Sequence, residues 1–213
     1  MKFLSYKIKN HEQQGFTLVE FIVIMSIFAI MVGVVLFNFT TFRSRVTLDN
    51  LAQDIALSIR QVQTTGGAGI TDDPTDPSNE RFRGIAFIRN ENGNGFEKKF
   101  IMYEASQSGK ENSAYIENSD EILDTISIGT PDTISDIVTG NSIESIMKDE
   151  GSSVGGNAVS IAFQRFNTRA YFSTDDPDGY DASSQYLCIK ITSPDGNTSR
   201  YVCVSSIGQV SVH

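Results

Sequence analysis

The chain has 213 residues, of which 39% are hydrophobic, and its formal net charge is −9. This length accommodates one main globular unit rather than two large independent domains. The acidic balance disfavours binding to nucleic acid phosphates. The two histidines are His11 and His213, so the globular region lacks an internal base for Ser–His or Cys–His catalysis, and no enzyme activity is expected.

A basic N-terminal segment precedes a long apolar run. Residues 1–15 contain Lys2, Lys7 and Lys9 against one acid, Glu12, and residues 16–39 are almost entirely apolar. The apolar run predicts a helix of roughly 36 Å, which is long enough to cross a bilayer. Positive charges on its N-terminal side predict one span, with the N-terminus in the cytoplasm and the rest of the chain outside.

Two residues are unusual for a simple membrane anchor. Gly15 is a small residue that stands before the apolar run, whereas a secretory signal is cleaved after its apolar core. Glu20 is ionisable and lies inside the run, where a charge costs about 2.5–3.5 kcal/mol unless it is paired. Cleavage at Gly15 would leave the apolar helix on the protein, and Glu20 is expected to need a positive partner.

The sequence GFTLVE at residues 15–20 resembles the processing site of type IV prepilins and type II secretion pseudopilins. The resemblance implies that a membrane prepilin peptidase cuts after Gly15 and that the new amino group of Phe16 is N-methylated. It also implies that Glu20 acts in assembly by meeting the Phe16 ammonium of an adjacent subunit, which offsets the cost of burying either charge alone. A plain signal anchor with an incidental glutamate is the alternative.

A resemblance of this kind implies protein partners in a membrane. The expected partners are the prepilin peptidase, other pilin or pseudopilin subunits contacted through the N-terminal helix, and an inner-membrane assembly platform; nucleic acid is not expected. The expected location is the inner or cytoplasmic membrane, as a single-pass protein, and then a pilus or pseudopilus filament. The alternative function is a filament-borne adhesin or DNA-uptake subunit that binds a ligand through surface loops.

A second pattern extends the helix beyond the apolar run. Apolar residues recur every three or four positions, as on one face of an amphipathic helix. They are Leu48, Leu51, Ala52, Ile55, Ile59 and Val62. We therefore expect one helix of about 50 residues that ends at Thr65, before Gly66 and Gly67.

The remaining sequence alternates short apolar runs with turn-rich stretches, a pattern typical of an antiparallel sheet. Three polar or Ser/Gly-rich stretches, 66–79, 106–121 and 151–157, are expected to be surface loops. The predicted fold is α+β, with a long N-terminal helix packed on a C-terminal antiparallel sheet domain, as in type IV pilins. The expected strands are 84–89, 96–103, 159–166, 169–172, 186–192, 200–204 and 209–212.

These elements predict four consecutive parts of the chain. They are a leader at 1–15, a transmembrane or filament-core helix at 16–39, the amphipathic half of the helix at 40–65 and a β-rich globular domain at 66–213. Within the last part, the motifs RGIAF, VSIAF and VCVSSIGQVSV resemble the GspH and FimT class of minor pseudopilins and minor pilins. That resemblance implies a glycine-centred turn, here at Gly208, before the final strand.

The two cysteines, Cys188 and Cys203, have the spacing of neither a zinc site nor a thioredoxin-like motif. A hairpin loop of two or four residues between strands 186–192 and 200–204 would place them opposite each other, with their apolar neighbours sharing one face. A three-residue loop with a bulge would separate them. Since register follows the hydrophobic pattern, we favour a disulfide in an oxidising exterior compartment.

The run DDPDGYD at residues 175–181 gathers carboxylates on a turn. Asp176, Asp178 and Asp181 are candidate calcium ligands, because calcium binds oxygen atoms. The run lacks the complete EF-hand spacing and its terminal glutamate, and Asp, Pro and Gly are also common in solvated turns. Calcium is therefore the one cofactor considered, and a solvated acidic loop is the alternative.

Overall fold

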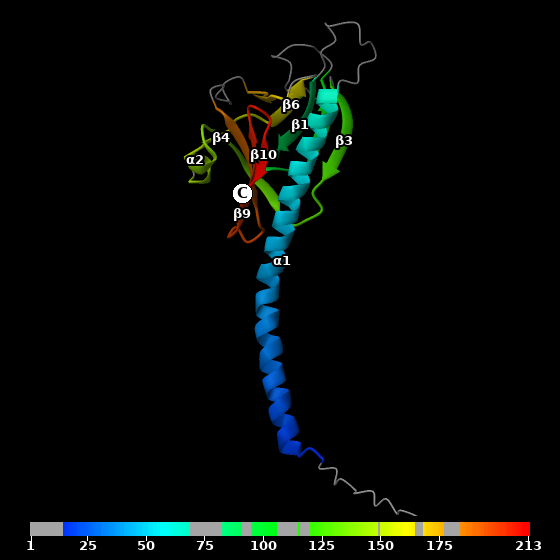
Figure 1. Cartoon of the computed structure of the whole chain (residues 1–213), viewed down its shortest axis with the longest axis vertical. Helices are drawn as coiled ribbons and strands as arrows, with labels where there is room; N and C mark the ends of the chain where they lie inside the picture. The colour runs from blue at the N-terminus through cyan, green and yellow to red at the C-terminus, as the bar shows by residue number, and fades with distance from the viewer. Residues whose placement is uncertain are drawn as a thin grey trace, which may run out of the picture. The chain divides into compact units, whose positions relative to one another are not determined.

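The computed structural model describes residues 15–68, 82–90, 95–105, 115, 120–148, 150–164, 168–176 and 184–213. Contacts divide the chain into two compact units, with the boundary between Arg43 and Ser44. Helix α1, Leu18–Ala68, contains this boundary. The described part of the second unit adds strands β1 to β10 and a short helix, α2 (Figure 1).

Within the second unit, α1 buries one apolar face. Every residue of the predicted amphipathic stripe is buried, and Ala56 joins them, so this prediction is confirmed. The helix continues to Ala68, beyond the predicted end at Thr65. Gly66 therefore lies inside the helix, where an added Cβ would stand 3.2 Å from the carbonyl oxygen of Phe163. This glycine permits close packing of the helix on a strand rather than ending the helix.

The first sheet has the strand order β3-β2-β1-β6-β7, and its strand pairs are antiparallel. Its central strand is β1, and β3 and β7 form the two edges. Successive residues point to opposite sides, so the sheet has an inner and an outer face. The strands are β1 Phe82–Arg89, β2 Phe96–Glu104, β3 Glu121–Ser127, β6 Ala158–Gln164 and β7 Ala170–Thr174.

The second sheet has the strand order β10-β9-β8-β4-β5 and is also antiparallel. Between β4 and β5 lies α2, Ile143–Met147, whose first turn is capped by a hydrogen bond from the Ser145 N–H to the Ser142 side chain. The α+β fold is thus confirmed, with two sheets in the globular part. The strands are β4 Thr133–Gly140, β5 Ser152–Ser153, β8 Tyr186–Thr192, β9 Ser199–Ser205 and β10 Val210–Val212.

One hydrophobic core joins α1 to the inner faces of both sheets. Fully buried members include Ile55 and Ile59 of α1, Ile85 and Phe163 of the first sheet and Ile189 of the second. Each such side chain contributes about 1.5–3 kcal/mol when it is buried. Smaller apolar clusters cover the outer faces, around Tyr103 on the first sheet and around Cys188 and Tyr201 on the second.

The strands confirm most of the predicted pattern but add elements that the sequence did not indicate. Each predicted strand appears with ends within two residues of the expected ones, whereas β3, β4, β5 and α2 were not predicted. In β4, Ile134 and Ile137 are both buried although they are three residues apart, because the register shifts between Ile134 and Asp136. Such a bulge breaks the alternation from which a strand is recognised. In β3, most residues are exposed at the sheet edge, so no buried face marks the strand.

The β8–β9 hairpin has the register that the apolar pattern predicts. Its ladder closes on a four-residue loop at 194–197, where Ser193 donates a backbone hydrogen bond to the Thr198 carbonyl. Cys188 stands opposite Cys203, and a disulfide joins them on the outer face of the second sheet. The neighbouring apolar pairs, which face the core, are Leu187 with Val204 and Ile189 with Val202.

We expect this disulfide to form in the exported protein and to stabilise it. Replacing both cysteines by alanine should lower the free energy of unfolding by about 2–3 kcal/mol, because the crosslink restricts the unfolded chain. Urea unfolding of the double variant beside the wild type measures the effect. Peptide mapping without reductant should find Cys188 linked to Cys203, and free thiols at both positions in protein from an oxidising compartment would contradict the prediction.

Candidate processing and assembly site

The predicted cleavage site lies immediately before α1. Gly15, Phe16 and Thr17 have no regular secondary structure, and the helix begins at Leu18. The Thr17 hydroxyl accepts a hydrogen bond of 3.2 Å from the Glu20 N–H, and the Thr17 carbonyl accepts one of 3.1 Å from the Phe21 N–H. Thr17 is therefore the N-cap, which satisfies backbone donors that a helix leaves open at its start.

Glu20 occupies the third helical position after this cap. A carboxylate in the first turn is favourable, because the N-terminal end of a helix carries partial positive charge. Threonine followed three residues later by glutamate is also the pattern of a capping box. The capping role of Thr17 was not predicted, although its pattern lies within the sequence GFTLVE. Glu20 thus lies at a defined point of the helix, and its side chain is exposed.

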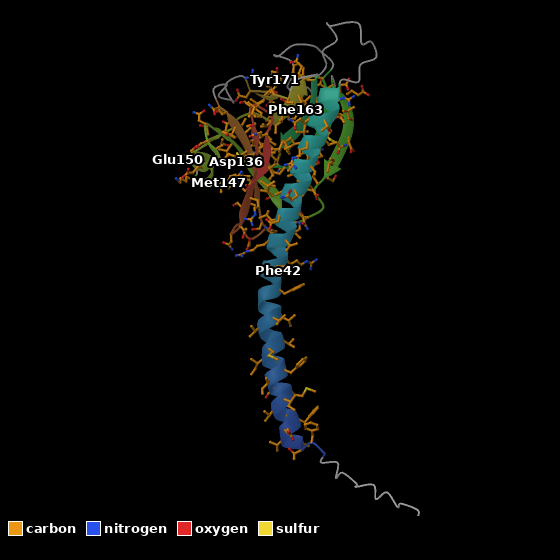
Figure 2. The ribbon with its side chains drawn as sticks, in the orientation of Figure 1. Phe42, Asp136, Met147, Glu150, Phe163 and Tyr171 are labelled. Atoms are coloured by element: carbon orange, nitrogen blue, oxygen red, sulfur yellow. A yellow bond between two sulfur atoms is a disulfide. The ribbon has the colours of Figure 1, made fainter. Side chains whose placement is uncertain are left out.

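The helix beyond Glu20 presents apolar side chains that no other part of the described chain covers. Leu18–Leu36 has a mean hydropathy of 2.7 and the length of a membrane span. Leu18 is 76% exposed and Leu36 is 62% exposed, and Figure 2 shows side chains standing out around this part of α1. Apolar surface of this extent is stable only in lipid or against other proteins.

The two residues that flank the predicted cut are accessible. Phe16 is 79% exposed, and no described atom outside its chain neighbours lies within 4 Å of the point where a Cβ would stand on Gly15. Packing within the described chain therefore gives no reason for a glycine at position 15.

The predicted calcium site lies mostly outside the described residues. Asp176 follows β7, while Asp178 and Asp181 lie outside the described residues. Among the residues that the structure does describe, no group of three or more His, Cys, Asp or Glu side chains could hold a metal ion. Calcium binding at this run stays a prediction.

Asp175, which opens the same acidic run, holds the start of β6. Its Oδ1 accepts hydrogen bonds from the backbone N–H groups of Asn157, at 2.7 Å, and Ala158, at 3.1 Å. Its Oδ2 accepts one of 3.1 Å from the Asn157 side-chain amide. Partial burial acts to raise the pKa of Asp175, but these hydrogen bonds outweigh it and lower the pKa below its usual value. The Asp175 carboxylate therefore stabilises the folded chain at the start of β6.

We expect Asp175→Asn to destabilise the protein by about 1 kcal/mol at neutral pH, a figure reduced for solvent screening. A lowered folded-state pKa gives stability that is present above the unfolded pKa, near 4, and is lost as the pH falls further. The melting temperatures of wild type and variant should therefore converge as the pH is lowered from 7 towards 3. Asp54→Asn on the exposed side of α1 is the control, and a pH-independent difference for Asp175→Asn would contradict the assignment.

Comparison with known proteins bears on the same N-terminal segment. A family model described as the prokaryotic N-terminal methylation motif matches residues 10–36. Comparisons with curated proteins and with solved structures gave no match. The matched segment contains Gly15, Phe16 and Glu20 together with most of the apolar run. It supports a type IV pilin-like protein that is processed by a prepilin peptidase and anchored in a membrane.

Proposed function

We propose that the chain is a minor pilin or pseudopilin, cut after Gly15 and assembled through its N-terminal helix into a type IV pilus or a type II secretion pseudopilus. The observation that carries this proposal is the arrangement at the start of α1. An accessible glycine lies three residues before the first residue of a capped helix, and that helix presents an uncovered apolar surface interrupted near its start by Glu20. A methylation motif covers the same residues.

Cleavage after Gly15 changes the chemistry of this site. It creates an ammonium on Phe16, four positions before Glu20 and next to the helix N-cap. Like the carboxylate, this ammonium is costly to bury alone in an apolar environment. When helices of adjacent subunits pack together, the Glu20 carboxylate of one can pair with the Phe16 ammonium of the other. Their attraction offsets the free-energy cost of burying each charge. N-methylation of Phe16 would retain its positive charge.

The second unit supports the finer assignment to the GspH and FimT class. The closing hairpin has the expected glycine-centred turn, with Gly208 at a φ of +87°. Its added Cβ would collide with the Thr168 carbonyl oxygen, so only glycine fits this turn. In that class the globular part is carried outside the membrane while the helix enters the filament. The partners of the proposal are accordingly the peptidase, other pilin subunits and an inner-membrane assembly platform.

Processing is the first test of this function. Co-expression with a prepilin peptidase should shorten the chain by residues 1–15, and intact-mass measurement should show Phe16 as the N-terminus with one added methyl group. Gly15→Val should abolish the cut without changing the helix, because nothing in the described chain contacts this position. The control is Gly33→Val, which lies farther along the same helix and also has open space around it. A new N-terminus at any other residue would refute the assignment.

A further inference from the structure

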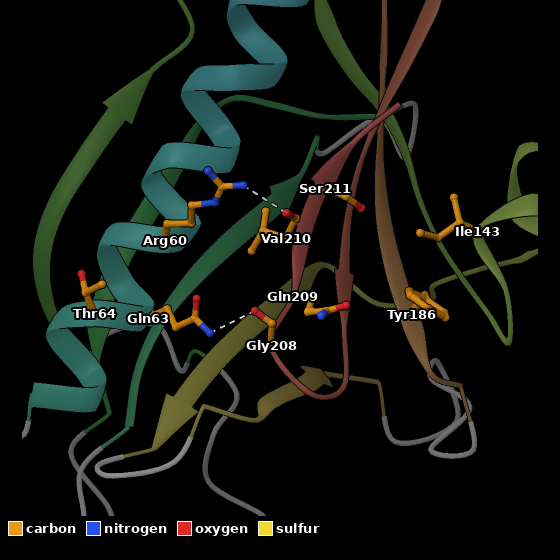
Figure 3. Close-up of a pocket in the computed structure, with 9 residues that line it drawn as sticks. All are labelled: Arg60, Gln63, Thr64, Ile143, Tyr186, Gly208, Gln209, Val210 and Ser211. Atoms are coloured by element: carbon orange, nitrogen blue, oxygen red, sulfur yellow. Dashed lines mark hydrogen bonds between the residues drawn. The ribbon is translucent and has the colours of Figure 1, made fainter.

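A groove of about 560 Å³ crosses the second unit beside the last strand. Figure 3 shows Arg60 and Gln63 of α1 on one side of β10, and Ile143 of α2 and Tyr186 of β8 on the other. The β10 segment, including Gln209 and Ser211, lies between them. Residues from four separate elements therefore line one surface.

The groove exists because the outer face of the second sheet is covered only in part. Ser211 pairs with Cys203, which belongs to the outer apolar cluster, and Ile143 and Tyr186 pack against the same cluster. The helix α2 comprises only Ile143–Met147 and leaves the β10 side of that face open. Since β10 is the end strand of its sheet, the next element on that side is α1.

Two hydrogen bonds hold the α1 wall in place. Arg60 donates from Nη2 to the Val210 carbonyl at 3.1 Å, and Gln63 donates from Nε2 to the Gly208 carbonyl at 3.0 Å. A guanidinium has five N–H donors in a rigid plane. The bond to Val210 uses one of them and fixes the position of the group, so Arg60 is pre-organised at the groove.

The residues that line the groove favour a ligand with a negative charge next to an apolar group. Of the described residues that line it, Arg60 alone is charged, and the side chains of Gln209 and Ser211 add neutral polar groups. This cation lies on a chain whose formal net charge is −9. The opposite wall, Ile143 and Tyr186, is largely apolar. Arginine binds carboxylates with two parallel hydrogen bonds, so the groove complements a carboxylate flanked by an apolar side chain.

We propose that this groove binds an extended acidic segment of a partner protein, with Arg60 pairing an Asp or Glu carboxylate and Ile143 and Tyr186 contacting the neighbouring apolar side chain. A protein segment fits better than a small molecule, because small-molecule sites enclose most of the ligand surface, whereas this groove lies over β10 between side chains of α1 on one side and Ile143 and Tyr186 on the other. The proposal does not depend on processing at Gly15 or on Glu20.

The test uses the full chain in detergent micelles and two fluorescein-labelled peptides, one alternating Glu and Val and the other alternating Lys and Val. Fluorescence anisotropy should show that the Glu–Val peptide binds about tenfold more tightly than the Lys–Val peptide. Arg60→Gln should weaken that binding about tenfold, whereas Arg60→Lys, which keeps the charge, should retain part of it. The control is Arg45→Gln, which removes the same charge from an exposed position of α1 outside the groove.

The place where the Glu–Val peptide binds is tested by attaching a benzophenone group to that peptide. Photocrosslinking followed by mass spectrometry should mark the segment that contains Gly208 and Ser211. The proposal would be overturned if the two peptides bind equally or if neither binds. It would also be overturned if Arg45→Gln weakens binding as much as Arg60→Gln does, since that result indicates unspecific attraction. Crosslinks confined to other segments would overturn it too. Circular dichroism of each variant establishes that its fold is intact before binding is compared.

Discussion

Glu20→Gln should leave cleavage and membrane insertion unchanged and should reduce recovery of the chain in filaments at least about tenfold. The reason is electrostatic. The Phe16 ammonium of an adjacent subunit would be left buried without its counter-charge, and breaking such a pair typically costs about 3–5 kcal/mol. Glutamine keeps nearly the same shape and also suits the third position of a capping box, so the start of α1, where Thr17 bonds the backbone N–H of this residue, should be preserved.

The measurement is the amount of chain that co-purifies with sheared filaments or with partner pseudopilins, at equal abundance in the membrane. Ser26→Ala is the matched control in the same apolar segment, because the Ser26 hydroxyl bonds the Val23 carbonyl of its own helix. Its recovery should equal that of the wild type. If Glu20→Gln is recovered as well as the wild type, Glu20 is not an intersubunit contact. If cleavage itself fails, the residue serves the peptidase instead.

Gly84→Val should destabilise the second unit by at least about 3 kcal/mol. Gly84 of β1 pairs with Tyr103 of β2, and an added Cβ would stand 2.5 Å from the Cζ and Oη atoms of that ring. Tyr103 is fully buried and packs edge-on against Tyr115, with 5.3 Å between ring centroids. Because the ring is fully buried, the larger side chain must displace the strand or the ring within the core.

Urea unfolding followed by circular dichroism measures this loss. Gly129→Val is the control, because no described atom outside its chain neighbours lies within 4 Å of its Cβ position, and its stability should stay close to that of the wild type. Replacing Tyr103 by alanine should cost less in the Gly84→Val background than alone, since it removes the collision. Additive effects of the two substitutions would show that the ring is not what excludes a side chain at Gly84.

The predicted elements that the structure confirms share one property. Their apolar residues recur at the interval set by the geometry of a helix or of a strand. The stripe from Leu48 to Val62 follows the helical repeat, and the alternation around Cys188 and Cys203 set the register of β8 against β9. Both patterns arise because one face of an element is buried and the other is not. Where that condition fails, as in the exposed edge strand β3 or at the bulge after Ile134, the sequence offers no period to recognise.

The candidate processing site was readable from the sequence because its parts are consecutive. Gly15, Phe16 and Glu20 lie within six residues, and the apolar run that follows is continuous in the chain. The groove beside β10 had no such signal. Its cation comes from residue 60, its apolar wall from residues 143 and 186, and its floor from residues 208–211, and none of these segments is distinctive alone.

The apolar helix, the motif at its start, the amphipathic stripe and the pairing register of the cysteine hairpin could therefore be predicted from the residues alone, since each depends on neighbours in the chain or on a simple repeat. Three features emerge only from the folded protein: the strands form two sheets on one core, Gly66 and Gly84 lie at close contacts between elements, and Asp175 holds the start of β6. These features depend on contacts between residues far apart in the sequence, and long-range packing carries no local pattern from which it can be read.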